Sequence, residues 1–315
     1  MPHPGRSFAR VAWLMFATAL LTASAVIGQT KTTAWTPPRT PDGRPDFQGI
    51  WDFRTATPLE RPAAFAGREF FTGEEAAAFE RQSAERLEET LAVHPADWLD
   101  YGRTVLASRR TSLIVDPADG RVPALTPAAR KKSAARAEAR RSADGPEAFS
   151  LGERCLLFGA GPPIIPGPYN NNIQIVQTRD TVVVFNEMIH DARIIPTDGR
   201  PHLPASIRPL MGDSRGRWDG DTLVIETTNF TDRTRFRGSD EHLRLIERFT
   251  RTDADTLIYE FTLDDPTAFA APWTARWPMA KTTARIYEYA CHEGNYGLRN
   301  MLTSARFAEK EATRK

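Results

Sequence analysis

The sequence is poor in cysteine, has almost no excess of either charge and has no long apolar run after residue 21, and each shortage excludes a class of protein. With 41 Lys and Arg against 40 Asp and Glu, its 315 residues create no strong field for capturing nucleic acid or an anionic membrane surface. An apolar share of 41% and a charged share of 26% exclude a disordered chain, a collagen-like fibre and a polytopic membrane protein. We therefore expect a globular protein with no nucleic-acid partner.

Complete catalytic motifs are missing as well. The sequence has no His-Glu-x-x-His, no P-loop and no Gly-x-Gly-x-x-Gly, which argues against a helix-borne zinc protease, an NTPase and a dinucleotide enzyme. Ser214 lies in Gly-Asp-Ser-Arg-Gly, but this string falls in an expected loop before Trp218 rather than between a strand and a helix. It therefore does not predict the nucleophile elbow of a serine hydrolase.

The first 28 residues have the order of a secretory signal peptide. Arg6 and Arg10 precede an apolar run over residues 11–21, and small residues follow at 23–25. The run is short for a membrane span of about 20 residues, so we expect cleavage rather than anchoring. The expected mature protein is periplasmic or secreted, with no stable membrane span after signal removal.

Two cysteines remain in the mature chain, Cys155 and Cys291. An oxidising compartment would allow them to form one long-range disulfide. Buried free thiols are the alternative, because two cysteines carry no spacing pattern that decides between the two states.

Residues 29–46 contain four prolines and predict an extended arm with a turn at Pro41-Asp42-Gly43. Residues 47–51 read as the first strand, and their Gly-x-Trp is similar to the start of lipocalin-like barrels. We expect a single β-rich domain over residues 47–315.

A helical insertion is expected at about residues 72–142. Thr72 and Glu75 have the spacing of a capping box and predict a helix over 73–91. Thr126-Pro127 predicts the start of a second helix that runs to about Arg141. The basic residues of that helix have no aromatic residue between them to stack a base, so we interpret them as a solvated face.

Runs rich in Val, Ile, Thr and aromatic residues predict strands near 173–176, 182–185, 223–226, 243–249, 257–263 and 284–289. An Asp-Thr pair stands directly before three of these runs, at 180–181, 221–222 and 255–256, and predicts a turn followed by a strand. The expected fold is mainly β, an antiparallel lipocalin-like barrel or sandwich whose meander closes on itself.

Several longer strings add a resemblance. The clearest are Pro-Asp-Gly-Arg-Pro-Asp at 41–46, Gly-Arg-Trp-Asp-Gly-Asp-Thr-Leu at 216–223 and Cys-His-Glu-Gly-Asn-Tyr at 291–296. With these strings the chain resembles an uncharacterised family of exported bacterial β-rich proteins, over most of the mature sequence. The resemblance implies export and implies no particular chemistry, since no activity is established for the family.

Three polar strings, at 190–193, 198–202 and 292–296, follow expected strands or the turns after them. A His beside a carboxylate is suited to acid–base chemistry, because its ordinary pKa of about 6.5 is easily shifted by a neighbour. Salt bridges and turn hydrogen bonds are the structural alternative for each string. The candidate catalytic residues are His190, Asp191, Arg193, His292 and Glu293.

Guanidinium, amide and aromatic groups near these strings are suited to holding a substrate. The candidate substrate-binding residues are Arg200, His202, Arg217, Trp218, Asn295 and Tyr296. A closed meander brings alternate strand ends to one mouth, so at least three of the polar residues should border one cavity. The residues to which this expectation applies are His190, Arg193, His202, His292 and Glu293.

No motif predicts a cofactor. The residue types allow a divalent metal at His190, His202, His292 and Glu293, because ligands on strands need no fixed spacing.

Two functions follow from these observations. One is an exported enzyme, a hydrolase, lyase or isomerase, that uses His and carboxylate acid–base chemistry on a small organic molecule in a β-barrel cavity. The alternative is a non-catalytic, lipocalin-like protein that binds a small molecule.

Overall fold

The computed structural model describes residues 35–90, 101–157, 161–234 and 236–314. The expected signal peptide at 1–28 and the first part of the arm, up to residue 34, lie outside these residues. In the rest of the arm, Gly43 N donates to Thr40 O at 2.8 Å, and the backbones of Arg39 and Pro45 form an isolated antiparallel β-bridge. Both contacts confirm the predicted turn.

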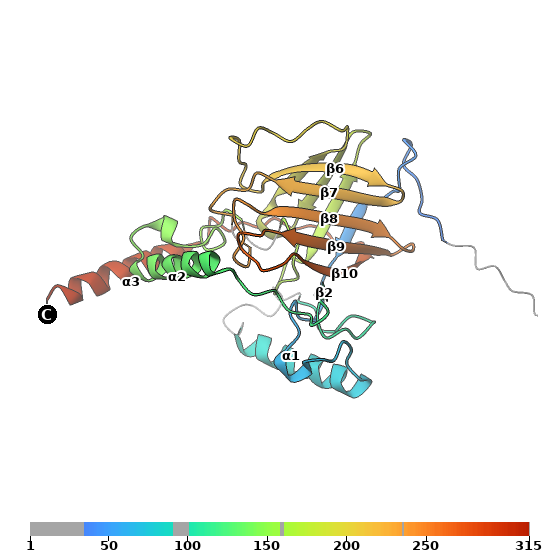
Figure 1. Ribbon diagram of the computed structural model, residues 1–315. Coiled ribbons are helices and arrows are strands. Elements are labelled where there is room, and N and C mark those ends of the chain that lie inside the picture. The colour runs from blue at the N-terminus through green and yellow to red at the C-terminus, as the bar shows by residue number, and fades with distance from the viewer. Residues whose placement is uncertain (1–34, 91–100, 158–160, 235, 315) are drawn as a thin grey trace, which may run out of the picture. The chain divides into compact units, whose positions relative to one another are not determined.

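Ten strands among the described residues form one antiparallel sheet (Figure 1). Their order across the sheet is β5-β4-β3-β1-β10-β9-β8-β7-β6, with β2 paired to β10 outside this path. The mainly β, antiparallel fold class is confirmed. The bounds are β1 (Gly49–Asp52), β2 (Ile114–Asp116), β3 (Asn172–Gln177), β4 (Thr181–Asn186), β5 (Ala192–Pro196), β6 (Asp213–Asp219), β7 (Thr222–Thr228), β8 (Arg244–Arg251), β9 (Thr256–Asp264) and β10 (Trp273–Thr282).

Side chains alternate between the two faces of the sheet, and one face is buried. Every second residue of β8 and β9 is buried, as the period of a strand requires. The core on this face is rich in aromatic rings, which supply large apolar areas and pack edge to face. It includes Trp51, Phe249, Tyr259, Phe261, Trp273 and Trp277.

The sheet curls around this core but does not close into a barrel. Arg193 on β5 reaches Glu247 on β8 although five strands separate these two in the sheet. Among the described residues no ladder joins the two end strands, β5 and β6. The expectation that the meander closes on itself is therefore wrong. β5 is an edge strand, and a proline such as Pro196, which has no N–H to donate to a neighbouring strand, is tolerated at such an edge.

Three α-helices lie among the described residues: α1 (Gly73–Thr90), α2 (Pro127–Ser142) and α3 (Tyr296–Ala312). The capping box of α1 is confirmed, since Glu75 N donates to Thr72 Oγ1 at 3.2 Å and Thr72 N donates to Glu75 Oε2 at 2.9 Å. Thr126 Oγ1 caps α2 by accepting from Ala129 N at 3.1 Å. Short 3-10 helices cover Ala63–Phe65 (η1), Pro146–Ala148 (η3) and Met188–His190 (η4).

The basic face of α2 is only partly solvated. Lys132 and Arg136 both bind the carboxylate of Asp240, which is buried, and Arg136 lies 2.7 Å from it. These two cations attach α2 to the segment that leads into β8, and the interpretation of a purely solvated face is corrected to that extent. No helix among the described residues has the length and apolar character needed to span a bilayer.

The three Asp-Thr pairs are confirmed as strand starts, because β4, β7 and β9 begin at Thr181, Thr222 and Thr256. Two other expectations are wrong. Residues 284–289 form no strand, and the last strand is β10, where Pro278 concealed the strand pattern. The string around Ser214 is strand β6 rather than a loop, because its pairing with β7 compensates for a run with few apolar residues.

Candidate functional site

A cavity of about 1350 Å³ lies at the end of the sheet where β3 begins and β4 ends. We call it the disulfide cavity, because both cysteines are in its wall. The wall is built from five parts of the chain: Arg54 after β1, the segment 150–155, the approach to β3, the turn after β4, and the segment from β10 into α3. Its lining includes Ser150, Glu153, Cys155, Tyr169, Asn170, Asn172, Glu187, Arg285, Tyr287, Glu288, Tyr289, Cys291, Gly294, Asn295 and Met301.

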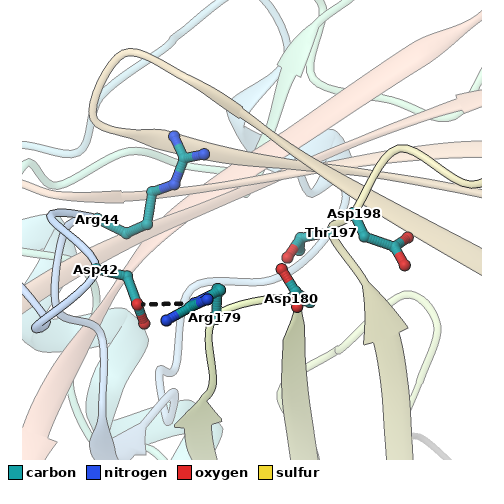
Figure 2. A pocket seen from close by; sticks show the side chains of 6 residues that line it. All are labelled: Asp42, Arg44, Arg179, Asp180, Thr197 and Asp198. Carbon is teal, nitrogen blue, oxygen red and sulfur yellow. Dashed lines mark hydrogen bonds and ion pairs between the residues drawn. The ribbon is translucent and has the colours of Figure 1, made fainter.

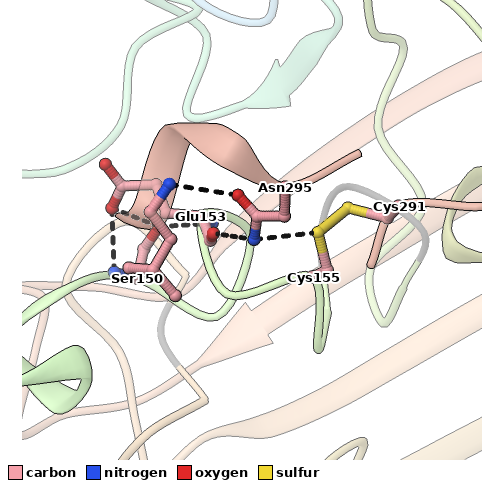
Figure 3. Close-up of a disulfide and its surroundings, with 6 residues drawn as sticks. Ser150, Glu153, Cys155, Cys291 and Asn295 are labelled. Carbon is pink, nitrogen blue, oxygen red and sulfur yellow. Dashed lines mark hydrogen bonds between the residues drawn. A yellow bond between two sulfur atoms is a disulfide. The ribbon is translucent and has the colours of Figure 1, made fainter. Parts of the chain in front are cut away.

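Cys155 and Cys291 form a disulfide between segments that are 136 residues apart in sequence (Figure 3). Asn295 stands beside it and caps α3 by accepting from Leu298 N at 3.1 Å. The amide of Asn295 donates to Glu153 O at 2.9 Å and lies 3.3 Å from Cys155 Sγ. The disulfide and this one side chain therefore fix the start of α3 against the opposite wall of the cavity.

Glu187 supplies a buried carboxylate to the same cavity, with only 3% of its surface exposed. Its Oε2 accepts from Asn172 Nδ2 at 2.8 Å, and its Oε1 accepts from Tyr287 N at 3.2 Å. Its backbone N donates to Asn172 O at 3.0 Å, which ties it to the first residue of β3. Both donors to the carboxylate are neutral groups.

Two tyrosines form an aromatic part of the wall. The rings of Tyr169 and Tyr289 stack, with their centroids 6.3 Å apart and their planes 19° from parallel. Burial, and then a hydrogen bond with Tyr169, raises the pKa of the Tyr289 phenol above its ordinary value. Tyr289 therefore remains a neutral phenol at physiological pH.

A second cavity, of about 650 Å³, adjoins the disulfide cavity and shares Ser150, Gly152, Tyr169 and Asn170 with it. Its wall is mostly apolar and contains several prolines, which hold a loop in a fixed shape. The apolar and proline residues include Phe53, Phe149, Leu157, Pro162, Pro163, Pro166, Pro168, Met188, Phe236 and Leu243.

Four of the eight described non-glycine residues with positive φ lie in the wall of the disulfide cavity or close to it in sequence. Cys155 and Asn170, both in the wall of the disulfide cavity, have φ of 55° and 54°. Directly after Glu187 and Met188, Ile189 and His190 have φ of 64° and 58°. A β-branched residue such as Ile189 rarely adopts a positive φ, and such strain is retained where a precise geometry serves function.

Arg193, a candidate catalytic residue, is on strand β5 and its side chain is buried rather than in a cavity wall. Its guanidinium binds Glu247 through two hydrogen bonds, at 2.5 and 2.9 Å, and Tyr259 donates to the same carboxylate at 2.8 Å. Burial alone would lower the pKa of Arg193, but the charge and hydrogen bonds of Glu247 raise it above its ordinary value. Burial, followed by the charge of Glu247, also raises the pKa of Tyr259. This cluster is a closed ion pair.

The other candidate catalytic residues lie near the disulfide cavity in sequence, but none of them lines it. His190 is exposed, and its ring packs edge-on against Phe185 with centroids 4.7 Å apart. Asp191 accepts from Ala192 N at 2.9 Å. His292 and Glu293 are exposed and follow Cys291 directly. The linings of the two adjoining cavities and of the charged cavity described below contain none of His190, Arg193, His202, His292 and Glu293.

The candidate substrate-binding residues are also dispersed. His202 Nδ1 lies 2.7 Å from Asp213 Oδ2, and Arg200 pairs with Asp198. Trp218 packs against Phe47 with ring centroids 5.4 Å apart. Arg217 and Tyr296 are exposed, and of the six residues only Asn295 lines the disulfide cavity.

A third cavity, of about 410 Å³, is formed by charged residues of the arm and two turns (Figure 2). Arg179 pairs with Asp42 at 3.3 Å, and hydrogen bonds from Arg200 lower the pKa of Asp198 to about 2. Exposed pairs of this kind contribute little to stability, and the Arg179–Asp42 pair attaches the arm to the turn before β4.

Ser214 is buried, and its hydroxyl lies 2.9 Å from the hydroxyl of Thr227 on the neighbouring strand. Among the described residues, no His or carboxylate forms a hydrogen bond with this hydroxyl. The described part of the chain also contains no group of three or more His, Cys, Asp or Glu residues arranged to hold a metal ion.

Sequence reasoning missed the residues that make the cavity polar and aromatic. Glu187 lies directly after strand β4, Asn172 is the first residue of β3, and Tyr169 lies three residues before it. Applying the strand-end rule to both ends of each strand would have found them. Comparisons of the chain with protein-family models, with curated proteins and with solved structures found no match.

Proposed function

We propose that the protein binds a small organic molecule in the disulfide cavity, without catalysis. The observation that carries the proposal is the wall of this cavity, which combines stacked tyrosine rings with a few fixed polar groups and is held by a disulfide and strained turns. A cavity with apolar and aromatic surfaces and a small number of placed polar groups is typical of a ligand site. Walls that are fixed in advance reduce the entropy lost on binding.

This site resembles that of a lipocalin in one respect, because the ligand would enter at the end of a curled antiparallel sheet. The disulfide supports an exported protein, since such bonds persist in oxidising compartments. N-terminal sequencing of protein recovered outside the cytoplasm tests export. A mature chain that begins between Val26 and Lys31 supports it, and a mature chain with residues 1–20 intact contradicts it.

The binding proposal is tested by filling the cavity. Gly294 lines it, and a Cβ placed there would meet no atom within 4 Å, so Gly294→Trp adds a ring to open space. We expect this variant to bind an apolar fluorescent dye at least tenfold more weakly than the wild type. Ala312→Trp, at the exposed end of α3, adds the same ring outside the cavity and should bind as the wild type does. Equal dye binding by both variants would reject the proposal.

An acid–base enzyme is the second candidate, and the positive φ of Ile189 and His190 favours it, because strained backbone collects at active sites. His190→Ala and His292→Ala should then each abolish turnover at a nearly unchanged Tm. Equal activity of both variants on a substrate of the wild type would exclude this candidate.

A further inference from the structure

The carboxylate of Glu187 presents an unusual charge balance for a buried group. An ionised carboxylate can accept about four hydrogen bonds, and Glu187 accepts one at each oxygen, from Asn172 Nδ2 and Tyr287 N. The described residues place no cation within ion-pair distance of it. Burying a charge without an opposite charge is costly, so a group retained in this state calls for an explanation.

Three of the other four buried carboxylates have a cation, and the exception is Asp265, whose Oδ2 has no hydrogen-bond partner among the described residues. Asp213 has Arg215 and His202, Asp240 has Lys132 and Arg136, and Glu247 has Arg193. Asp265 has no cation among the described residues, but its Oδ1 accepts three hydrogen bonds in one turn, from Thr267 N, Thr267 Oγ1 and Ala268 N, and it lines none of the three cavities described above. Glu187 is thus distinguished by facing a cavity.

The surroundings of Glu187 in the cavity suit a cation. Tyr169, Tyr287 and Tyr289 line the same wall, and the faces of aromatic rings attract ammonium groups. Of the arginines in the lining, Arg54 is already paired with Asp52 at 2.6 Å and Arg285 lies on an exposed segment. The turn with positive φ at Ile189 and His190 begins two residues after Glu187.

We propose that the disulfide cavity takes a ligand with a primary ammonium group, which donates to Glu187, and an aromatic or apolar body, which lies against Tyr169 and Tyr289. This inference rests on the proposed binding function and names its ligand class. The ammonium supplies the positive charge and the donors that the carboxylate lacks, and charge-assisted hydrogen bonds are stronger than neutral ones.

The test compares two probes of nearly equal shape, 2-phenylethylammonium and 2-phenylethanol, titrated into the mature full-length protein by calorimetry. We expect the wild type to bind the ammonium at least tenfold more tightly than the alcohol. In Glu187→Gln this preference should fall to about one, with the affinity for the alcohol unchanged. Asp265→Asn removes a buried carboxylate that lines none of the three cavities, and it should retain the full preference.

The outcomes separate this inference from the function on which it rests. Binding of both probes with equal affinity by the wild type, and loss of both in Gly294→Trp, would overturn the ammonium preference and leave the binding function in place. A preference that persists in Glu187→Gln, or that is lost equally in Asp265→Asn, also overturns the role of Glu187. Failure of the cavity-filling variant to weaken dye binding would reject both. The wild-type preference alone decides the question if Glu187→Gln does not fold.

Discussion

Glu247 and Glu187 are the same residue type and both are buried, Glu247 in strand β8 and Glu187 directly after strand β4, and they differ in what faces them. In the interior of the sheet, Glu247 meets Arg193 and Tyr259, and every partner comes from the protein. At the end of the sheet, Glu187 meets two neutral donors and a cavity. The comparison teaches that burial of a charged residue does not by itself indicate a site. A site is indicated when the protein leaves the charge incompletely balanced beside open space.

The largest expected difference between the two carboxylates comes from replacing each of them by glutamine. Glu247→Gln leaves Arg193 as a buried cation without a counter-charge, and we expect it to lower the free energy of unfolding by about 3 to 5 kcal/mol. Denaturant unfolding with the disulfide intact measures this loss. Combining Arg193→Met with Glu247→Leu removes both charges and should recover most of the stability. A Glu247→Gln variant as stable as the wild type would show that the ion pair between Arg193 and Glu247 does not stabilise the fold.

The disulfide is the next largest contribution, and it acts at the end of the sheet alone. Replacing both cysteines by serine frees a loop of more than a hundred residues in the unfolded chain, so we expect a loss of about 2 to 4 kcal/mol. The same variant should weaken dye binding in the cavity, because the start of α3 is no longer fixed. Hydrogen exchange provides the matched readout. In the variant, the amides of β8 and β9 should remain as strongly protected, compared with the other strands, as they are in the wild type. The amides of α3 should exchange faster than in the wild type.

Glu187→Gln should change stability much less than Glu247→Gln. The exchange removes a charge that has no buried cation to leave behind. The amide oxygen can still accept from Tyr287 N while Asn172 Nδ2 loses its acceptor, so we expect a loss of about 1 kcal/mol. The same unfolding experiment measures it. A loss as large as that of Glu247→Gln would mean that Glu187 is a structural anchor for the segment after β10, and the distinction between the two carboxylates would fail.

The smallest expected effect comes from an exposed carboxylate, Asp198. Hydrogen bonds from Arg200 lower its pKa from 3.8 to about 2 in the folded protein. A lowered pKa stabilises the fold above the unfolded value of 3.8, and this contribution is lost as the pH falls through 2. The chemical shift of the Asp198 carboxyl carbon, followed against pH, should show the lowered pKa, and Arg200→Gln should return it towards 3.8. A midpoint near 3.8 in the wild type would contradict the pairing.

Much of the fold could be predicted from short strings. The caps at Thr72 and Thr126 and the strand starts at Thr181, Thr222 and Thr256 all agree with the structure. Each depends on hydrogen bonds or backbone preferences within three or four residues, which the local sequence contains in full. The errors were at β6 and β10, where pairing with neighbouring strands decided the structure of runs whose own pattern was weak.

The candidate site shows the same division. Sequence placed polar groups at strand ends and identified Asn295, but it placed Arg193 and the histidines in one shared cavity. In the structure Arg193 forms a buried ion pair with Glu247, which is 54 positions away in the sequence. No adjacent residue indicates such a partner, because the ion pair exists only once the sheet has curled.

The sequence by itself therefore determined the β-rich class, the caps of α1 and α2 and the turns, since these depend on neighbours along the chain, whereas α3 was not predicted. Only the tertiary structure decided that the sheet stays open between β5 and β6, that Cys155 meets Cys291, and that Glu187 faces a cavity while Glu247 faces Arg193. The physical reason is distance along the chain. A carboxylate has the same chemistry at either position, and the fold alone determines whether its counter-charge comes from the protein or is left to a ligand.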